Sequence, residues 1–422
     1  MKKMILVFWV GFIVVSSGVR TASAGEVDIL LQKLVEKGVL TAGEAQEIGT
    51  ETKEQAKKEM IQGKNEILPS WIQTTKLKGD LRVRYQRDYT VGASADRNRG
   101  RVRMRLGLET KPNDKIIVGI GLATGLSDGS ADAARSTNAT FEKGFSKKPL
   151  ALDYAYAKYT PFSGLALTAG KMKNPLWEPG DLIWDTDINP EGGAVQLTKK
   201  LNDKTQLFFN SAVFILGEAS ASNDDPLLAA LQPGVEFGLT EKITLKGAVS
   251  YYAFSNVKGN SLDGNAGSNT YSSGTTLKYG YDTITPAVEI GFKDPLKPIG
   301  LDCLNIPYLA LFGEYVNNPQ VKKNQSGQMV GVRIGMEKVA AWKDWQFVYN
   351  YARLEKDALV DILPDSDRYG GKAGVKAHEG MMSLGLGKNT SLGVDYYYGS
   401  KIAAQKSQAP AQVLQVDWNL KF

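Results

Sequence analysis

Residues 99–108 read RGRVRMRLGL, and arginine occupies every second position, at Arg99, Arg101, Arg103 and Arg105. Apolar residues stand at the alternate positions 102, 104, 106 and 108. Side chains of a β-strand point alternately to its two sides, so this stretch predicts a strand with one cationic face and one apolar face. Such a strand suits a soluble sheet with a wet face, or a transmembrane barrel whose apolar side meets lipid and whose arginines meet a hydrated lumen.

The preceding run repeats this pattern, with Arg82 and Arg84 set between Leu81, Val83 and Tyr85. An arginine that faces lipid at the middle of a membrane costs about 2–4 kcal/mol, so a one-residue slip of such a strand would cost several times as much. In a barrel, all six arginines are therefore expected to line the pore. The pattern leaves open whether they select solutes or only keep the lumen face polar.

Similar alternation, in runs of about 10 to 14 residues, fills the chain from residue 77 onward. Sixteen runs are found, near residues 77–90, 98–111, 114–125, 150–160, 163–173, 191–200, 203–217, 227–239, 242–256, 280–293, 306–317, 326–338, 343–355, 377–388, 390–400 and 410–422. They predict an all-β fold, a 16-stranded antiparallel transmembrane β-barrel that occupies residues 71–422. A ring of this size is expected to enclose a water-filled lumen instead of a side-chain core.

The connections between the runs alternate in length. Short ones lie near residues 111–114, 161–164, 201–203, 240–241 and 388–390, and long ones near 126–149, 174–190, 257–279 and 356–376. An up-and-down transmembrane barrel has this rhythm, because its periplasmic turns are short and its outer loops are long. The fold of a soluble β-sandwich does not require short and long connections to alternate. The connection 294–305 departs from the rhythm, since it should be short and is not.

The last run ends at the C-terminal residue of the sequence. Its apolar residues are alternate ones: Leu414, Val416, Trp418, Leu420 and Phe422. This arrangement resembles the terminal signal by which bacterial outer-membrane barrels are recognised for insertion. The resemblance implies barrel-assembly machinery as a partner and outer-membrane lipid as the surroundings.

The amino-terminal region differs from the rest. Residues 1–24 combine Lys2 and Lys3, an apolar run of 12 residues and the sequence Ala22-Ser23-Ala24, which predicts a secretory signal peptide cleaved near Ala24. The apolar run is too short for a membrane-spanning helix, which needs about 20 residues. Residues 25–70 then predict a helical or coiled-coil segment in the periplasm. Its second helix, through about Met60, begins with the capping box Thr41–Glu44, and a semi-ordered tail is an equally good interpretation of that helix.

Composition excludes several kinds of chemistry. The single cysteine, Cys303, allows no intrachain disulfide and is expected to be a small buried or turn residue, and the single histidine, His378, argues against histidine-based metal sites or triads. We expect no cofactor and no metal. The formal charge of +6 falls to +3 without residues 1–24, which gives no reason to expect a nucleic-acid partner.

The long connection at residues 174–193, NPLWEPGDLIWDTDINPEGG, is acidic and contains no lysine or arginine. Counted from a periplasmic start, it is the third outer loop. Its acidic residues are Glu178, Asp181, Asp185, Asp187 and Glu191. General porins fold this loop into the barrel, and by that resemblance the acidic loop would face the arginines and form the constriction. The alternative is an acidic loop exposed at the cell surface.

Specific stretches resemble the putative porin family of Gram-negative outer membranes. They are Gly170–Pro175, Trp184–Gly192, the arginine-rich hairpin from Asp80 and the segment Leu152–Tyr156. The resemblance covers most of the chain after residue 77. It implies a general-porin-like channel in the cell outer membrane and names no solute. General porins are commonly trimers, so a homotrimer is expected by analogy.

Three functions remain open at this point. The first is a porin for passive diffusion of small hydrophilic solutes and ions, in which the arginines would favour anions and the acidic loop would oppose them. The second is a structural or adhesin barrel that is plugged and does not conduct. The third is an outer-membrane hydrolase, but Ser383 lies five residues from His378, an odd spacing that places the two on opposite faces of one strand.

Overall fold

The computed structural model describes residues 24–67, 69–90, 96–125, 131–218, 224–301, 306–403 and 410–422. The chain divides into two compact units, Met1–Gln73 and Thr74–Phe422. The predicted signal peptide, apart from Ala24, and Cys303 lie outside the described residues. Within the described part of the chain, no helix has the length and apolar character needed to cross a membrane.

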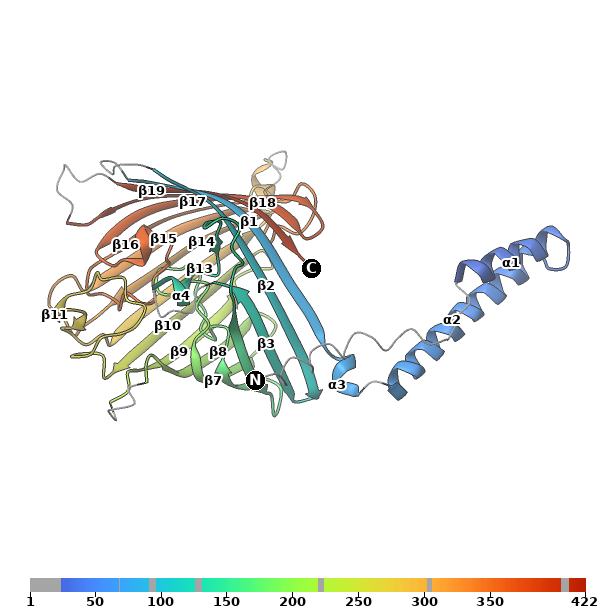
Figure 1. The fold of residues 1–422 in the computed structure, drawn as a ribbon, viewed down its shortest axis with the longest axis horizontal. Coiled ribbons are helices and arrows are strands. Elements are labelled where there is room, and N and C mark those ends of the chain that lie inside the picture. Colours follow the sequence, from blue (N-terminus) through green and yellow to red (C-terminus); the bar gives the residue numbers. More distant parts are fainter. Residues whose placement is uncertain are drawn as a thin grey trace. The chain divides into compact units, whose positions relative to one another are not determined.

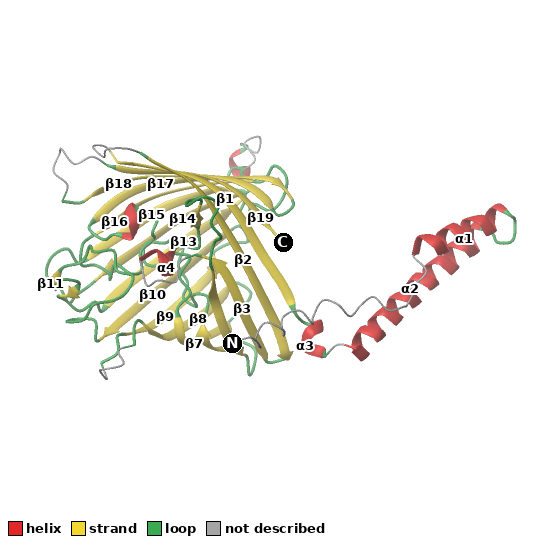
Figure 2. Ribbon diagram, viewed as in Figure 1, coloured by secondary structure: helices red, strands yellow, loops and turns green. Residues whose placement is uncertain are grey.

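The first unit contains a helical hairpin (Figure 2). Its helices are α1 (Ala24–Glu36), α2 (Ala42–Ile67) and α3 (Ser70–Gln73). The capping box is present, since the Thr41 backbone N–H donates to Glu44 at 2.8 Å and the Glu44 N–H donates to the Thr41 hydroxyl at 3.3 Å. Lys53 of α2 pairs with Asp28 of α1 at 3.0 Å. Helix α2 is longer than the sequence predicts: it ends at Ile67, whereas the predicted end is near Met60.

The second unit is a closed antiparallel barrel (Figure 1). The strands of its wall are β1 (Lys76–Thr90), β2 (Arg97–Asn113), β3 (Ile116–Thr124), β5 (Leu150–Tyr159), β6 (Leu165–Lys171), β7 (Glu191–Lys200), β8 (Thr205–Ile215), β9 (Leu227–Gly238), β10 (Ile243–Ser255), β13 (Thr283–Lys293), β14 (Tyr308–Asn317), β15 (Ser326–Gly335), β16 (Trp345–Leu354), β17 (Val375–Gly387), β18 (Thr390–Lys401) and β19 (Ala411–Lys421). The sheet also includes the short β4 (Ala139–Thr140), which pairs with β2. The predicted 16-stranded barrel is confirmed, and each predicted run corresponds to one wall strand.

Smaller elements lie in the connections. In the described part of the chain they are α4 (Ala131–Arg135), the ribbon of β11 (Tyr271–Ser273) and β12 (Thr276–Leu277), and the 3-10 turns η1 (Lys297–Ile299) and η3 (Tyr369–Gly371). The turn η1 lies in the unexpectedly long connection between β13 and β14. The five short connections that the sequence predicts, near residues 111–114, 161–164, 201–203, 240–241 and 388–390, fall on the same rim, as an up-and-down order requires.

The barrel closes where the last strand pairs with the first. Leu81 lies opposite Leu420 and Arg84 lies opposite Asp417. The final residue completes this seam, because the backbone of Phe422 exchanges two hydrogen bonds with Gly79, at 2.8 and 3.0 Å. A side chain at position 79 would collide with the Phe422 ring, which a built Cβ approaches to 2.4 Å. Closure pairs the strand edges that a membrane cannot hydrate.

The outer and inner faces of these strands differ in the way that the alternation predicts. Val83 and Trp418 are 40% and 49% exposed on the outside, whereas Arg84 and Gln415 are 4% and 1% exposed on the inside. Apolar side chains therefore form the lipid-facing surface, and polar side chains face inward. The same parity holds on β1, β2 and β19, which meet at the seam.

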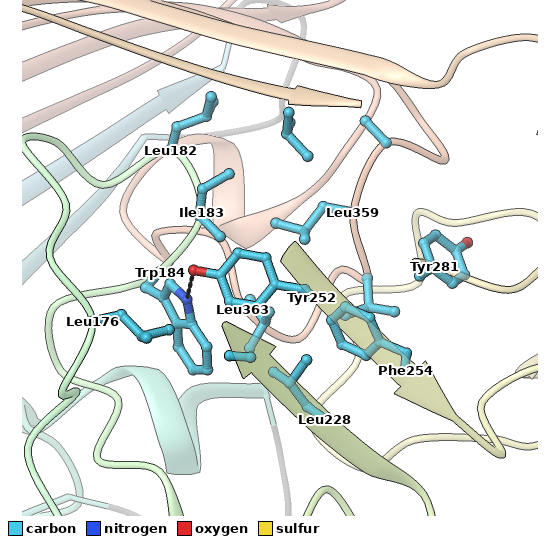
Figure 3. Packing of buried hydrophobic residues seen from close by; sticks show 14 of the residues in the cluster. Leu176, Leu182, Ile183, Trp184, Leu228, Tyr252, Phe254, Tyr281, Leu359 and Leu363 are labelled. Atoms are coloured by element: carbon cyan, nitrogen blue, oxygen red, sulfur yellow. Dashed lines mark hydrogen bonds between the residues drawn. The ribbon is translucent and has the colours of Figure 1, made fainter. Parts of the chain in front are cut away.

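An apolar core fills one side of the lumen (Figure 3). Inward-facing residues of β7 to β16, such as Phe214 and Tyr252, pack there against Trp184 and Leu359, which lie in outer loops. The prediction of a lumen without a side-chain core is therefore wrong for this part of the barrel. The reason is that three outer loops carry apolar residues of their own, and burying these against the wall is favourable.

Candidate functional site

The third outer loop (residues 172–190) lies against the inner wall of the barrel. Gln232 on β9 holds its backbone from both sides, accepting from the Trp177 N–H at 2.7 Å and donating to the Trp177 carbonyl at 2.8 Å. Glu314 on β14 accepts from the N–H groups of Gly180 at 2.8 Å and Leu182 at 3.0 Å. Because both anchors come from inward-facing positions, the loop is folded inside the barrel.

Two aromatic side chains strengthen this attachment. The indole N–H of Trp184 donates to the Tyr252 hydroxyl at 3.1 Å, and that hydroxyl donates to Glu178 at 3.0 Å (Figure 3). Trp184 also meets the Phe214 ring edge-on, with ring centroids 5.9 Å apart. Burial and the neighbouring carboxylate of Glu314 raise the pKa of Glu178 well above its ordinary value.

The seventh outer loop (residues 355–374) packs on the third. The Asp185 N–H donates to the Leu363 carbonyl, and the Ser366 N–H donates to the Asp185 carboxylate, both at 2.8 Å. Burial, together with the negative charge of Asp187, raises the pKa of Asp185 to about 7, although hydrogen bonds from Asp187 and Ser366 oppose the shift. The two loops form one assembly inside the barrel.

A buried arginine joins two further loops to this assembly. Arg135 of α4, in the second outer loop, is 2% exposed. Its guanidinium donates to the carbonyls of Asp361 and Pro364 at 3.1 Å, Gly371 at 3.2 Å and Gly264 at 3.3 Å. The second, fifth and seventh outer loops therefore meet at one cation.

The arginines of β1 and β2 point inward and are engaged with acceptors. Arg84 donates to both carboxylate oxygens of Asp417 at 2.7 and 2.8 Å and to Asp367 at 3.2 Å. The others have the following partners: Arg82 with Asn138 at 2.6 Å and Asp417 at 3.7 Å, Arg99 with Asp88 at 2.6 Å, Arg101 with Gln86 at 2.9 Å, and Arg103 with Asp80 at 2.8 Å. These pairs neutralise much of the positive charge that the sequence suggests.

Arg105 makes the direct contact between the arginines and the third outer loop. It forms an ion pair with Asp187 and donates to the Thr137 hydroxyl at 2.7 Å. Asp187 also accepts from the Thr137 N–H at 3.2 Å. Burial alone would raise the pKa of Asp187, but the positive charges of Arg105, Arg103 and Arg82 lower it to about 2.

A polar cavity of about 300 Å³ lies beside this contact. Its charged lining residues are Arg82, Arg84, Arg103, Arg135, Asp181, Asp185, Asp187, Asp365, Asp367, Glu379, Asp395 and Asp417. Thr186, Ser383 and Tyr397 also line it. The cavity is bounded by the strands around the seam on one side and by the second, third and seventh outer loops on the other.

Not all of the predicted site residues reach this cavity. Arg99, Arg101 and Arg105 lie outside its lining, and Arg105 lines a second cavity of about 400 Å³ that includes Asp80, Asp153 and Phe422. Of the predicted loop residues, Asp181, Asp185 and Asp187 line the first cavity. Glu178 faces Tyr252 instead, and Glu191 pairs with Lys171 at 2.8 Å while its side chain is 61% exposed.

Three carboxylates in the cavity wall are arranged closely enough to share a cation. Oxygens of Asp181, Asp365 and Glu379 lie within 4.8 Å of one another. Nη2 of Arg368 donates to Asp181 at 2.6 Å and to Glu379 at 2.8 Å. An arginine thus already supplies positive charge at the position where a metal ion would sit.

Several lining residues were not predicted from the sequence. Asp365 and Asp367 belong to the seventh outer loop, and residues 356–376 contain four aspartates alongside four lysines and arginines. Asp417 alternates with the apolar residues of the last strand, so barrel closure would have placed it beside the first strand. Assigning Asp417 to the site requires the strand register across the seam. Assigning Asp365 and Asp367 requires the inward fold of the seventh outer loop.

These features define a class of protein. A closed antiparallel barrel with an apolar exterior, long loops on one rim and a third outer loop folded against its inner wall is a transmembrane β-barrel channel.

The family is shown by a sequence comparison. The family model described as putative porin matches residues 38–95, 87–288 and 275–422, so the chain belongs to the putative porin family. The match begins within the helical hairpin and is not confined to the barrel. Family and fold together make the chain an outer-membrane porin.

Solved structures resemble the barrel at low sequence identity. OprB of Pseudomonas putida, in a high-pH structure, is 10% identical, with 83% of this chain and 95% of that chain covered and a TM-score of 0.54, which supports the fold. A mutant porin of Rhodopseudomonas blastica is 11% identical, with 82% of this chain and 100% of that chain covered and a TM-score of 0.42. Among curated proteins, none matches the chain.

Proposed function

We propose that the protein forms a water-filled channel for passive diffusion of small hydrophilic solutes and ions. In this proposal the narrowest part of the channel is the cavity between the seam strands and the third and seventh outer loops. The supporting observation is the composition of that cavity, whose walls carry charges of both signs and hydroxyl groups from Thr186, Ser383 and Tyr397. Such walls can replace part of the hydration shell of a polar solute.

The roles of individual residues follow from their partners. Arg82, Arg84 and Arg103 would form the cationic side of the constriction, and Asp185 and Asp187 the acidic side. Arg105 would act as an anchor that holds Asp187 and the loop in place. The ion pair between Arg105 and Asp187 joins the cationic wall directly to the acidic loop. An electric field across the lumen, from the arginines to the carboxylates, would therefore act only in the cavity beside this pair.

The charge balance supports a modest preference for cations, a sign that the sequence left open. The lining contains eight carboxylates and four arginines. Protonation of Asp185, whose pKa is raised to about 7, and of Asp365, whose pKa burial raises well above its ordinary value, reduces the excess near neutral pH. Carboxylates that line a pore attract cations.

A plugged structural barrel is the second candidate, favoured by one observation. The apolar core formed by the third, fifth and seventh outer loops covers the inner faces of β7 to β16. If these loops also close the remaining polar cavity, the barrel would not conduct.

Planar-bilayer recording separates the two candidates. The purified protein is added to a bilayer in symmetric KCl, and the salt is then made asymmetric to measure the reversal potential. Stepwise currents with a small cation-selective reversal potential are expected. A protein that inserts without steps would instead establish the plugged barrel.

The other predicted partners also remain proposals. The exposed aromatic rings of Trp418 and Phe422, at 49% and 63%, support recognition of the last strand by barrel-assembly machinery, and removal of Phe422 should lower the yield of inserted protein. Chemical crosslinking in the membrane tests the trimer. A hydrolase receives no support, because His378 is exposed and bonded to Tyr349 while Ser383 lines the cavity.

A further inference from the structure

The outer side of the wall at β5, β6 and β7 differs from the rest of the barrel exterior. We define the low-wall face as Ala157, Ala169, Lys171, Glu191 and Gly193. We propose that this face packs against a second copy of the chain within the membrane, with the lysine and the glutamate at the contact. Such an interface can form around an open channel or a plugged barrel alike, so it does not depend on the proposed function.

The wall is lowest at β6. This strand, Leu165–Lys171, has seven residues and is the shortest of the wall strands that the structure describes, whereas β1 and β2 have 15 and 17. A strand needs about 9–11 residues to cross a membrane at its usual tilt. The chain then turns inward, since Met172 is 2% exposed and its N–H donates to the Pro190 carbonyl at 2.9 Å. The wall at β6 therefore ends within the membrane.

An ion pair lies on the outer side of the wall at this point. Lys171 lies opposite Glu191 of β7, and the Lys171 Nζ is 2.8 Å from a Glu191 carboxylate oxygen. By strand alternation the two residues share their faces with Leu167 and Leu197, which are 38% and 41% exposed on the lipid side. The pair therefore belongs to the outer face of the barrel and not to the lumen.

The depth of this pair is near the middle of the membrane. Tyr159 and Phe162, both exposed, mark the periplasmic interface at the turn between β5 and β6. Lys171 lies six positions after Leu165, the first residue of β6. At a rise of about 3.3 Å per residue and a tilt of about 40°, this is about 15 Å into an apolar band about 25 Å tall. Charged side chains that face lipid at this depth are costly, so we expect protein to cover them.

The backbone above the ion pair also requires cover. Beyond β6 and β7 the chain continues as the irregular backbone of the third outer loop, and the Lys171 Nζ donates to the Asn189 carbonyl there at 3.1 Å. Irregular backbone does not occur in contact with the lipid hydrocarbon, and it is tolerated at this depth where protein buries it. A second wall placed against the low-wall face would bury it.

Small side chains give this face a flat surface. Ala157 of β5 lies opposite Ala169 of β6, which in turn lies opposite Gly193 of β7, and all three are exposed. On the other side of the barrel, outward positions carry larger residues such as Leu311 and Val330, which are 47% and 60% exposed. Small residues allow two backbones to approach closely within a membrane.

The charges favour a second copy over an unrelated partner. Copies of one chain enter the membrane in the same orientation, so a cyclic assembly brings together positions of equal depth. Lys171 and Glu191 lie side by side at one depth. The lysine of one copy can therefore pair with the glutamate of the next, and the face is complementary in charge to itself.

The first test uses a photoreactive residue in the full-length protein in outer membranes. Ala169 is replaced by p-benzoylphenylalanine, and Val330, on the other side of the barrel, is replaced in the control. We expect irradiation to link two copies of the chain at position 169 and to give lipid adducts at position 330, as identified by mass spectrometry. Adducts at position 169 with lipid alone or with a different protein would overturn the proposal, as would equal linking of chains at both positions.

The second test changes the ion pair. Lys171→Glu places two carboxylates at the contact and should lower the fraction of assembled chains about tenfold, measured by native mass spectrometry in mild detergent. The exchange Lys171→Glu/Glu191→Lys keeps both signs and should restore assembly. Arg353→Glu is the matched control, because it breaks the ion pair with Glu355 away from this face, and it should leave assembly unchanged.

Heat-modifiability on gels verifies that each barrel is folded. Assembly of folded Lys171→Glu at the wild-type level, or an equal loss in Arg353→Glu, would overturn the proposal. Neither test measures conduction, so failure here is distinct from failure of the proposed channel.

Discussion

The two halves of the barrel interior are built from the same alternating strands but carry opposite chemistry. Around the seam, from β17 through β19 to β2, inward positions hold charged groups such as Arg84, Glu379 and Asp417. From β7 to β16 many of them hold apolar groups such as Phe214 and Leu228, which are covered by loops, although Gln232 and Glu314 there bind the backbone of the third loop. The comparison shows that alternation decides which side chains face inward, whereas the loops decide whether that inner face is wet or packed.

Removing the largest aromatic anchor of the packed half should have the largest effect. Trp184→Ala creates a cavity in the apolar core and removes the hydrogen bond to Tyr252, which should cost about 3–5 kcal/mol. The third outer loop should then loosen, and single-channel conductance should rise. Bilayer recording together with thermal unfolding measures both effects. Unchanged conductance would mean that the packed half does not set the width of the channel.

Breaking the principal ion pair of the charged half should come next. Arg84→Ala removes this cation from the buried Asp417 and the half-buried Asp367, which should cost about 3 kcal/mol. The double variant Arg84→Ala/Asp417→Asn should recover part of the lost stability, because one uncompensated carboxylate is removed. Thermal unfolding in detergent tests this cycle. The cycle is completed by Asp417→Asn alone, and a double variant whose loss equals the sum of the two single losses would show that the pair contributes nothing to the seam.

The contact between the third and seventh loops should weaken as pH rises. The folded-state pKa of Asp185, about 7, lies above the ordinary value of 3.8. The stabilisation by its protonated form is therefore complete below about pH 4 and is lost as pH rises through about 7. Current noise and proteolysis of the loops should increase between pH 5 and pH 8. Asp185→Asn should remove this dependence, and a pH response that persists in this variant would contradict the assignment.

The smallest expected effect is on ion selectivity. Arg103→Ala removes one cation from the cavity wall and should shift the reversal potential further toward cations. One charge about 4 Å from an ion in water is worth about 1 kcal/mol, so the permeability ratio should change by at most about fivefold. Arg99→Ala is the matched control, because Arg99 lies outside the cavity lining. Equal shifts in both variants would mean that the cavity is not where ions are selected.

Much of the fold could be predicted from the sequence, for a physical reason. A membrane barrel needs apolar residues at every second position, so the sixteen strands and the inward direction of Arg82 and Arg103 follow from local pattern. The capping box at Thr41 is local in the same way.

The candidate site could be predicted only in part, because it depends on contacts between distant segments. The pairing of Arg84 with Asp417 joins the two ends of the barrel, and the contact of Asp185 with Ser366 joins two loops. The packed half was missed because apolar residues in the loops, such as Leu359 and Leu363, show no periodicity that assigns them to the interior.

Accessibility of single cysteines to a water-soluble thiol reagent tests the central claim most directly. The claim is that the water path follows the seam and that the opposite half is packed. In a Cys303→Ser background, Ser383→Cys places a thiol in the cavity wall, and Ala230→Cys places one in the apolar core, where the native residue is 0% exposed. We predict rapid modification and reduced current for Ser383→Cys, and neither change for Ala230→Cys. Rapid modification and current block at position 230, with none at position 383, would contradict the account.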